Sequence, residues 1–165
     1  MNLLIVDDEF LLAERIAEEL RYEGLELDVI FCAYSAQMAK EILSQNNVEI
    51  LIADVEMPEE SGIDLLEWME KQGLTPVKIL LTGHRKFEYA YEAMHYNCLK
   101  YLLKPMSMKE IKIVVQEAID KRIREQVFDK WWKNLSEDEK SRLTEEEEQT
   151  DIVAQVKKII RENIS

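Results

Sequence analysis

Five side chains whose types suit phosphoryl chemistry stand at the ends of short apolar runs. They are Asp7, Asp8, Asp54, Thr82 and Lys104. Three clustered carboxylates repel one another and raise each other's pKa unless a cation neutralises them. Mg²⁺ meets that need, because it takes a few carboxylates together with water and phosphate oxygens. The hydroxyl and ammonium groups suit the oxygens of a phosphoryl group, so Asp54 is the candidate nucleophile toward phosphorus.

Each of these residues also has an ordinary structural explanation. An aspartate after a strand commonly caps a helix or stabilises a turn, as Asp7 or Asp8 would before a helix from Phe10. Thr82 would then simply end a strand, and Lys104 would be a solvated lysine. The functional interpretation is favoured because all of them occur together, in order, at four strand ends.

The elements that position these side chains follow from the hydrophobic pattern of residues 1 to 123. Continuous apolar runs, each followed by a helical pattern, indicate a parallel sheet covered on both faces. Five such units predict a doubly wound α/β sandwich, in which the carboxyl ends of the strands share one edge. The expected strands are Leu3–Val6, Leu27–Cys32, Ile50–Ala53, Val77–Leu81 and Leu99–Leu103, and the expected helices are Phe10–Glu23, Ser35–Gln45 with a serine cap, Gly62–Lys71, Phe87–Tyr96 and Ser107–Ile123.

The last helix is expected to continue beyond the sheet, as a helical extension over residues 124–135. Apolar residues recur every four positions, and nothing breaks the helix before about Asn134. Exposed apolar residues on such an extension need a partner, such as a second copy or another domain. The residues that carry this pattern are Ile111, Val115, Ile119, Ile123, Val127, Trp131 and Trp132.

An acidic linker is expected over residues 136–150. The stretch from Ser136 to Asp151 holds eight acidic and two basic residues, typical of a solvated segment. A second amphipathic helix is expected over residues 151–165. A lone helix of that length forms no domain, so the chain is expected to stop where another domain should continue.

Composition excludes several classes of protein. The chain has 165 residues, 47% of them hydrophobic, which is enough for the core of one domain. Its net charge of -13 would repel nucleic acid phosphates. It has neither a signal peptide nor the ~20 apolar residues of a membrane span, so a cytoplasmic location is expected. Cys32 and Cys98 are expected to be buried thiols, and two histidines exclude a histidine-rich metal site.

The ordered set of Asp7-Asp8, Asp54, Met57-Pro58, Gly62, Thr82 and Lys104-Pro105 strongly resembles the receiver domain of bacterial two-component response regulators. That resemblance implies a flavodoxin-like sheet of order 2-1-3-4-5. It also implies a phosphoacceptor switch that catalyses only its own phosphorylation and dephosphorylation, with the phosphoryl group coming from a sensor histidine kinase.

The resemblance assigns roles to individual residues of this sequence. Asp54 would accept the phosphoryl group, and Lys104, aimed inward by a cis bond to Pro105, would pair with that group. The ligands of Mg²⁺ would be Asp8, Asp54 and the backbone carbonyl of Glu56, with Asp7 assisting through water. Thr82 and Tyr101 would be the switch residues. Glu56 and His84 lie where members of the family differ in phosphate lifetime.

The motifs "FEYAYEAM" and "YLLKP" narrow the resemblance to receivers linked to AraC-type helix-turn-helix domains. Residues 151–165 look like the first helix of such a domain, which implies that DNA contacts come only through a missing C-terminal part. Receivers with LytTR-type output remain an alternative, since they also carry "YLLKP". The stripe of Phe87, Tyr91, Met94 and Tyr101 suggests phosphorylation-linked dimerisation, with core packing as its alternative.

Two other functional classes stay open at this point. A haloacid-dehalogenase-like phosphatase also uses a nucleophilic aspartate and a second acid two residues later, where Glu56 stands. Pro58 and the acidic pair near the N-terminus count against that class. A degenerate receiver that works by contacts alone is the other, and the intact acceptor set argues against it.

Overall fold

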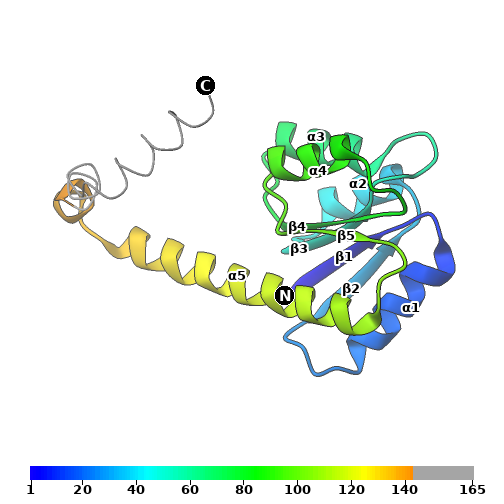
Figure 1. Ribbon diagram of the computed structural model, residues 1–165. Helices are drawn as coiled ribbons and strands as arrows, with labels where there is room; N and C mark the ends of the chain where they lie inside the picture. Colours follow the sequence, from blue (N-terminus) through cyan, green and yellow to red (C-terminus); the bar gives the residue numbers. More distant parts are fainter. Residues whose placement is uncertain (143–165) are drawn as a thin grey trace. The chain divides into compact units, whose positions relative to one another are not determined.

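The computed structural model describes residues 1–142, and from Asn2 to Asn134 five strands alternate with five helices (Figure 1). The expected order of elements is confirmed, with small shifts at several ends. The strands are β1 (Asn2–Val6), β2 (Val29–Ala33), β3 (Ile50–Asp54), β4 (Val77–Thr82) and β5 (Lys100–Leu103). The helices are α1 (Phe10–Arg21), α2 (Ala36–Gln45), α3 (Gly62–Lys71), α4 (Phe87–His95) and α5 (Met108–Asn134).

The strands form one sheet in the order β2-β1-β3-β4-β5, and every pair is parallel. The expected doubly wound sheet of order 2-1-3-4-5 is therefore confirmed. The registers align the carboxyl ends: Val6 pairs with Ala53, Asp54 with Leu81, and Thr82 with Leu103. One edge of the sheet thus collects the polar residues that end β3 and β4 and those that follow β1 and β5.

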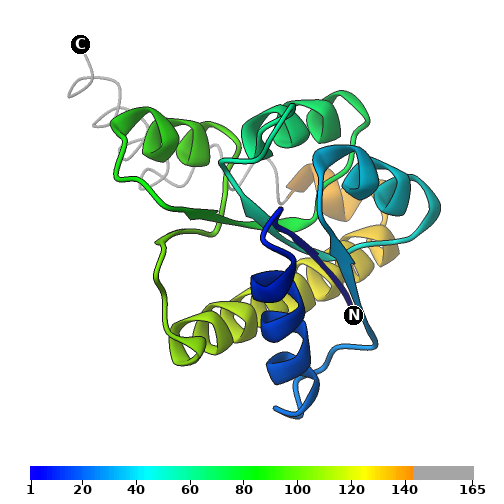
Figure 2. The same cartoon turned by 90° about the vertical axis from the view of Figure 1, so that its right-hand side faces the viewer.

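Helices cover both faces of the sheet, as the two views show (Figures 1 and 2). Side chains alternate along each strand, so Leu3 and Ile5 of β1 face one core, whereas Leu4 and Val6 face the other. The first core is completed by α1 and α5, and the second by α2, α3 and α4. Continuous apolar strands are explained by this double burial.

Two local expectations need correction. Strand β2 begins at Val29 rather than Leu27, because Leu27 packs on the core from a turn in which its N–H donates to the Leu25 carbonyl at 2.7 Å. Cys32 and Cys98 are half-buried free thiols rather than fully buried ones. Burial raises the pKa of each thiol to about 11, so both stay protonated at neutral pH.

Helix α5 continues to Asn134, which confirms the expected long C-terminal helix. The contacts within the chain divide it after Ile123, and beyond that point Val127, Phe128 and Trp131 are exposed. Within the acidic segment, residues 137–142 are helical. Ser136 starts this turn of helix, since its hydroxyl accepts from the Glu139 N–H and its own N–H donates to the Glu139 carboxylate. The helix expected over residues 151–165 lies outside the described residues.

None of the helices in the described part of the chain has both the length and the apolar character needed to cross a membrane.

Candidate functional site

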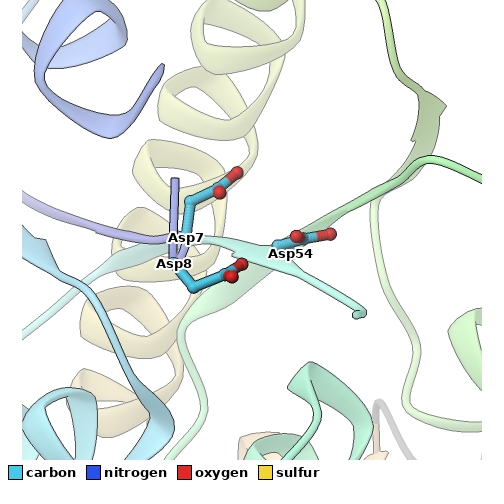
Figure 3. A group of neighbouring side chains, drawn as sticks. All are labelled: Asp7, Asp8 and Asp54. Atoms are coloured by element: carbon cyan, nitrogen blue, oxygen red, sulfur yellow. The ribbon is translucent and has the colours of Figure 1, made fainter. Parts of the chain in front are cut away.

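Three carboxylates meet at the carboxyl edge of the sheet (Figure 3). Asp54 is the last residue of β3, while Asp7 and Asp8 directly follow β1. Each offers an oxygen, and these oxygens lie within 4.8 Å of one another. Asp7 and Asp54 are buried, whereas Asp8 is exposed at the mouth of the cluster. The structure therefore brings together the acids that the sequence placed on separate strand ends.

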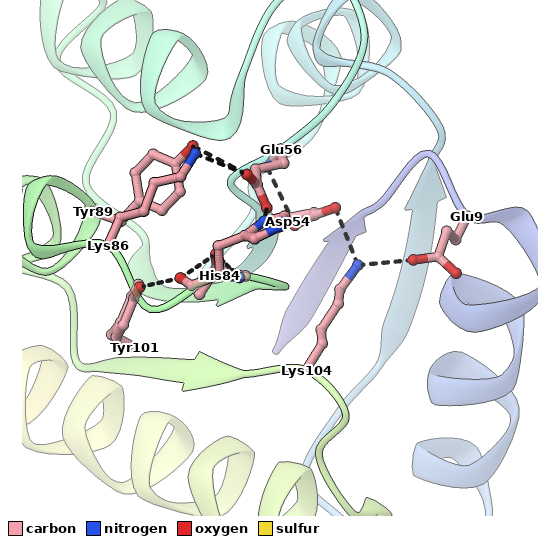
Figure 4. Close-up of polar contacts among 9 residues, drawn as sticks. Glu9, Asp54, Glu56, His84, Lys86, Tyr89, Tyr101 and Lys104 are labelled. Atoms are coloured by element: carbon pink, nitrogen blue, oxygen red, sulfur yellow. Dashed lines mark hydrogen bonds and ion pairs between the residues drawn. The ribbon is translucent and has the colours of Figure 1, made fainter.

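Lys104, which follows β5, supplies the positive charge of the cluster (Figure 4). Its ammonium nitrogen lies 2.7 Å from Asp7 Oδ2, 3.1 Å from Asp54 Oδ2 and 3.3 Å from Glu9 Oε1. The contact with Glu9 was not predicted from the sequence. The peptide bond between Lys104 and Pro105 is cis.

Burial and charge act in opposite directions on these groups. Burial raises the pKa of Asp7 and of Asp54 above its usual value, and Lys104 only partly counters that rise. For Lys104 itself burial lowers the pKa, but the contacts with Asp7 and Asp54 outweigh burial and the net pKa is raised. Lys104 thus keeps its positive charge, and this one charge does not balance the carboxylates around it.

The donor set fits a small hard cation. Asp7 Oδ2 is buried, and its charged partner is the Lys104 ammonium group, whose nitrogen lies 2.7 Å away. Its other oxygen accepts from the Glu9 N–H at 2.9 Å. Oxygen-only donors around one partly open cluster are what Mg²⁺ takes, with water completing its shell. We therefore regard Asp7, Asp8 and Asp54 as a candidate magnesium site.

The loop after β3 lies close against Asp54. The Glu56 N–H donates to Asp54 Oδ1 at 3.3 Å, and the Gly62 N–H donates to the Val55 carbonyl at 3.0 Å. A Cβ added at Gly62 would lie 2.1 Å from the Asp54 carbonyl oxygen. Gly62 therefore serves the close approach of two backbone segments at the start of α3.

The two expected switch residues share one hydrogen-bond acceptor (Figure 4). Thr82 is fully buried, and its hydroxyl donates to the His84 carbonyl at 3.1 Å while accepting from the His84 N–H at 3.1 Å. The hydroxyl of the half-buried Tyr101 donates to the same carbonyl at 3.0 Å. His84 thus ties both hydroxyls to the β4–α4 loop.

Sequence reasoning missed a second group of polar contacts around the Glu56 side chain. Its carboxylate lies 2.5 Å from His84 Nδ1, 3.2 Å from the Tyr89 hydroxyl and 3.4 Å from Lys86 Nζ. The hydrogen bond with His84 is the largest of the effects that lower the pKa of Glu56. The hydrogen bond with Tyr89 is the next largest of them. No periodic pattern in the sequence predicts such a cluster, because its members come from two loops and a helix that only the fold brings together.

The stripe on α4 lies on the surface. Phe87 and Met94 are each 81% exposed and Tyr91 is 58% exposed, so the alternative that they form core is wrong. Tyr101 is half-buried beside them on β5.

Comparison with known proteins agrees with this geometry. The family model for the response regulator receiver domain matches residues 3–116. An uncharacterized transcriptional regulatory protein, YesN of Bacillus subtilis, is 32% identical over 129 residues, which are 78% of this chain and 35% of that protein. The transcriptional regulatory protein HptR of Staphylococcus aureus is 25% identical, over 76% of this chain and 49% of its own. This chain thus spans less than half of the length of these relatives.

Solved structures show the same likeness. A two-component transcriptional regulator AraC from Clostridium phytofermentans matches with a TM-score of 0.70 and 27% identity, covering 76% of this chain and 98% of that one. A Francisella response regulator receiver domain matches with a TM-score of 0.66 and 27% identity, covering 73% and 97%. The expected resemblance to receivers of AraC-type regulators is thereby confirmed.

The family match also separates the receiver from one open alternative, the phosphatase. It covers the three acids, the hydroxyl of Thr82 and Lys104, and it carries no support for a haloacid-dehalogenase-like phosphatase. A receiver domain acts as a phosphoacceptor switch rather than as a conventional enzyme. This chain belongs to the response regulator receiver family of two-component signalling.

Proposed function

We propose that Asp54 accepts a phosphoryl group from a sensor histidine kinase in a Mg²⁺-dependent reaction. The observation that carries this proposal is the buried Asp54 carboxylate, 3.1 Å from Lys104 and clustered with Asp7 and Asp8. An Asp54 oxygen forms the new bond to phosphorus, and the bond between phosphorus and the donor's imidazole nitrogen breaks. The departing imidazole then takes up a proton from solvent.

The other site residues position the phosphoryl group and neutralise its negative charge. Lys104 lies beside Asp54 and pairs with the incoming phosphoryl oxygens, which carry the charge of the transition state. Thr82, at the end of β4, turns its hydroxyl from the His84 carbonyl to the phosphoryl group. Asp8, Asp54 and the Glu56 carbonyl would hold Mg²⁺, and Asp7 would assist through water. Bound there, Mg²⁺ supplies positive charge against the acids and the phosphoryl oxygens.

Intact-protein mass after incubation with Mg²⁺ and acetyl phosphate tests the proposal. We expect one added phosphoryl group, absent when the metal is chelated and absent in Asp54→Asn. A matched control is Asp120→Asn, which removes an exposed carboxylate on α5 and should leave the adduct unchanged. An adduct that persists in Asp54→Asn, or none after rapid acid quenching, would contradict the proposal.

The output is proposed to be transcriptional. The solved AraC regulator to which the chain is similar supports this assignment, since its name describes a two-component transcriptional regulator. We assign residues 1–123 to the receiver, 124–135 to a helical extension, 136–150 to an acidic linker and 151–165 to the first helix of an AraC-type DNA-binding domain. DNA would then be contacted only by parts of a longer protein.

Activation is proposed to pair two copies through α4. Phe87, Tyr91 and Met94 form an exposed apolar stripe along that helix, next to Tyr101. Apolar stripes of this kind mark interaction surfaces. A movement of Thr82 toward the phosphoryl group would release the His84 carbonyl, and Tyr101, bound to the same carbonyl, would turn inward and reshape this surface.

Beryllium trifluoride, which mimics a phosphoryl group on a carboxylate, tests this coupling. We expect the bound form to double in mass by light scattering and Tyr101 to leave the His84 carbonyl in a crystal or by NMR. Met94→Glu should keep the rotamer change but remain monomeric, because a charge in an apolar contact is costly. The same Tyr101 rotamer in both forms would contradict the switch, and an unchanged mass would contradict the pairing of two copies.

A further inference from the structure

Helix α4 is weakly held by apolar packing. Of its nine residues only Ala93 is buried and the Tyr89 ring is partly buried against the core, whereas Phe87, Tyr91 and Met94 are exposed. Its N-terminus lacks the usual side-chain cap, since the capping position is Lys86 and no side-chain cap bond forms there. Something other than core packing must therefore contribute to the position of this helix.

The carboxylate of Glu56 supplies that contribution. From the loop after β3 it accepts the Tyr89 hydroxyl at 3.2 Å and Lys86 Nζ at 3.4 Å, and it lies 2.5 Å from His84 Nδ1 (Figure 4). Lys86 also bonds the Tyr89 hydroxyl at 3.0 Å and lies 4.8 Å from the centre of its ring. One carboxylate thus joins the β4–α4 loop, the start of α4 and the first turn of α4.

We propose that these four side chains, the Glu56 latch, hold α4 in its resting position and oppose activation of the receiver. The latch consists of Glu56 as acceptor and His84, Lys86 and Tyr89 as its partners. Each polar contact of this kind stabilises the resting position modestly, and the contacts act on a helix whose core packing is limited to Ala93 and the Tyr89 ring.

The latch is connected to the phosphoacceptor, and this step rests on the proposed function. The backbone N–H of Glu56 bonds Asp54, and His84 bonds Thr82 through its N–H and its carbonyl. When Thr82 turns to a phosphoryl group, both backbone bonds of His84 to Thr82 are lost. The Glu56 side chain still bonds the loop and α4, beside the added negative charge on Asp54. Activation must therefore overcome the latch.

Hydrogen exchange of the α4 amides tests the latch without any phosphoryl donor. Tyr89→Phe removes the hydroxyl that reaches Glu56 but keeps the ring, which packs against the core. We expect the α4 amides to exchange about threefold to tenfold faster, the range that one lost hydrogen bond gives. The matched control is Tyr91→Phe, on the same helix, whose exposed ring stacks on His95 and takes no part in the latch. Unchanged exchange in Tyr89→Phe, or equal acceleration in both variants, overturns the latch.

The second readout is the apparent affinity for beryllium trifluoride with Mg²⁺. If the latch opposes activation, Tyr89→Phe and Lys86→Met should bind the mimic about threefold to tenfold more tightly, because less of the binding energy is used to shift the population. A purely structural role would accelerate exchange but leave this affinity unchanged or weaker, and that result overturns the regulatory part. Faster exchange in a protein that binds no mimic at all would instead support the latch and contradict the proposed phosphoacceptor function.

Discussion

Lys104→Met should slow phosphorylation of Asp54 by about 10²- to 10³-fold while Mg²⁺ binds more tightly. The rate falls because the variant loses the ammonium group that lies beside Asp54 and would stabilise the transferring phosphoryl oxygens. The metal affinity rises, by about tenfold, because one positive charge is removed from among carboxylates that the cation itself would neutralise. Stopped-flow phosphorylation with acetyl phosphate and calorimetric Mg²⁺ titration measure the two effects.

A matched control exists on β5, the strand that leads to Lys104. Lys100→Met removes a surface lysine of β5 whose partner is Glu117 on α5, at 3.1 Å. Surface ion pairs contribute little, so this variant should keep both the rate and the metal affinity. If Lys104→Met lowered both quantities together, the lysine would be organising the metal site rather than serving the phosphoryl group.

Gly62→Ala should lower the free energy of unfolding by about 3 kcal/mol. The added methyl group would lie 2.1 Å from the Asp54 carbonyl oxygen and 2.9 Å from its carbonyl carbon, and these are backbone atoms that cannot swing aside. Relief requires the loop after β3 to move away from the start of α3. That movement weakens the bond from the Gly62 N–H to the Val55 carbonyl and shifts the phosphoacceptor. Urea unfolding followed by circular dichroism gives the change in stability.

The comparison variant is Gly83→Ala. A Cβ at Gly83 meets only Glu56 Oε2, at 3.6 Å, which is ordinary contact. The free energy of unfolding of Gly83→Ala should change by no more than about 0.5 kcal/mol. It should rise slightly if the main effect is that alanine restricts the unfolded chain. Equal losses in the two variants would show that the steric explanation for Gly62 is wrong.

The sheet and the acidic cluster were predictable because each follows from a local rule. Continuous apolar runs such as Ile50–Ala53, each followed by a helical pattern, indicate strands buried on both faces, and parallel strands end on one edge. That edge rule alone brings Asp7 beside Asp54, although they are far apart in the chain. Ser35, expected as a cap, accepts the Met38 N–H at 3.1 Å in the structure.

Other features could not be predicted because they depend on distances between elements. The apolar residue Leu27 signals burial, but the signal is the same for a strand and for a turn that packs on the core. The stripe of Phe87, Tyr91 and Met94 shows that α4 has an apolar face, and the sequence does not say whether anything covers it. The partners of the Glu56 carboxylate come from loops and helices whose approach depends on the whole fold.

The two separate cores of the sheet give α4 and α5 different mechanical roles. Helix α5 buries Ile111, Val114, Val115, Ala118 and Ile119 in one core, whereas α4 buries only Ala93 in the other. Displacing α5 would expose several large side chains, whereas displacing α4 would expose only Ala93 and the partly buried Tyr89 ring. We therefore expect α5 to stay fixed on the sheet and α4 to be the helix that moves. The phosphorylation signal should then pass to a partner that contacts the exposed face of α4, and not along the chain through a displacement of α5.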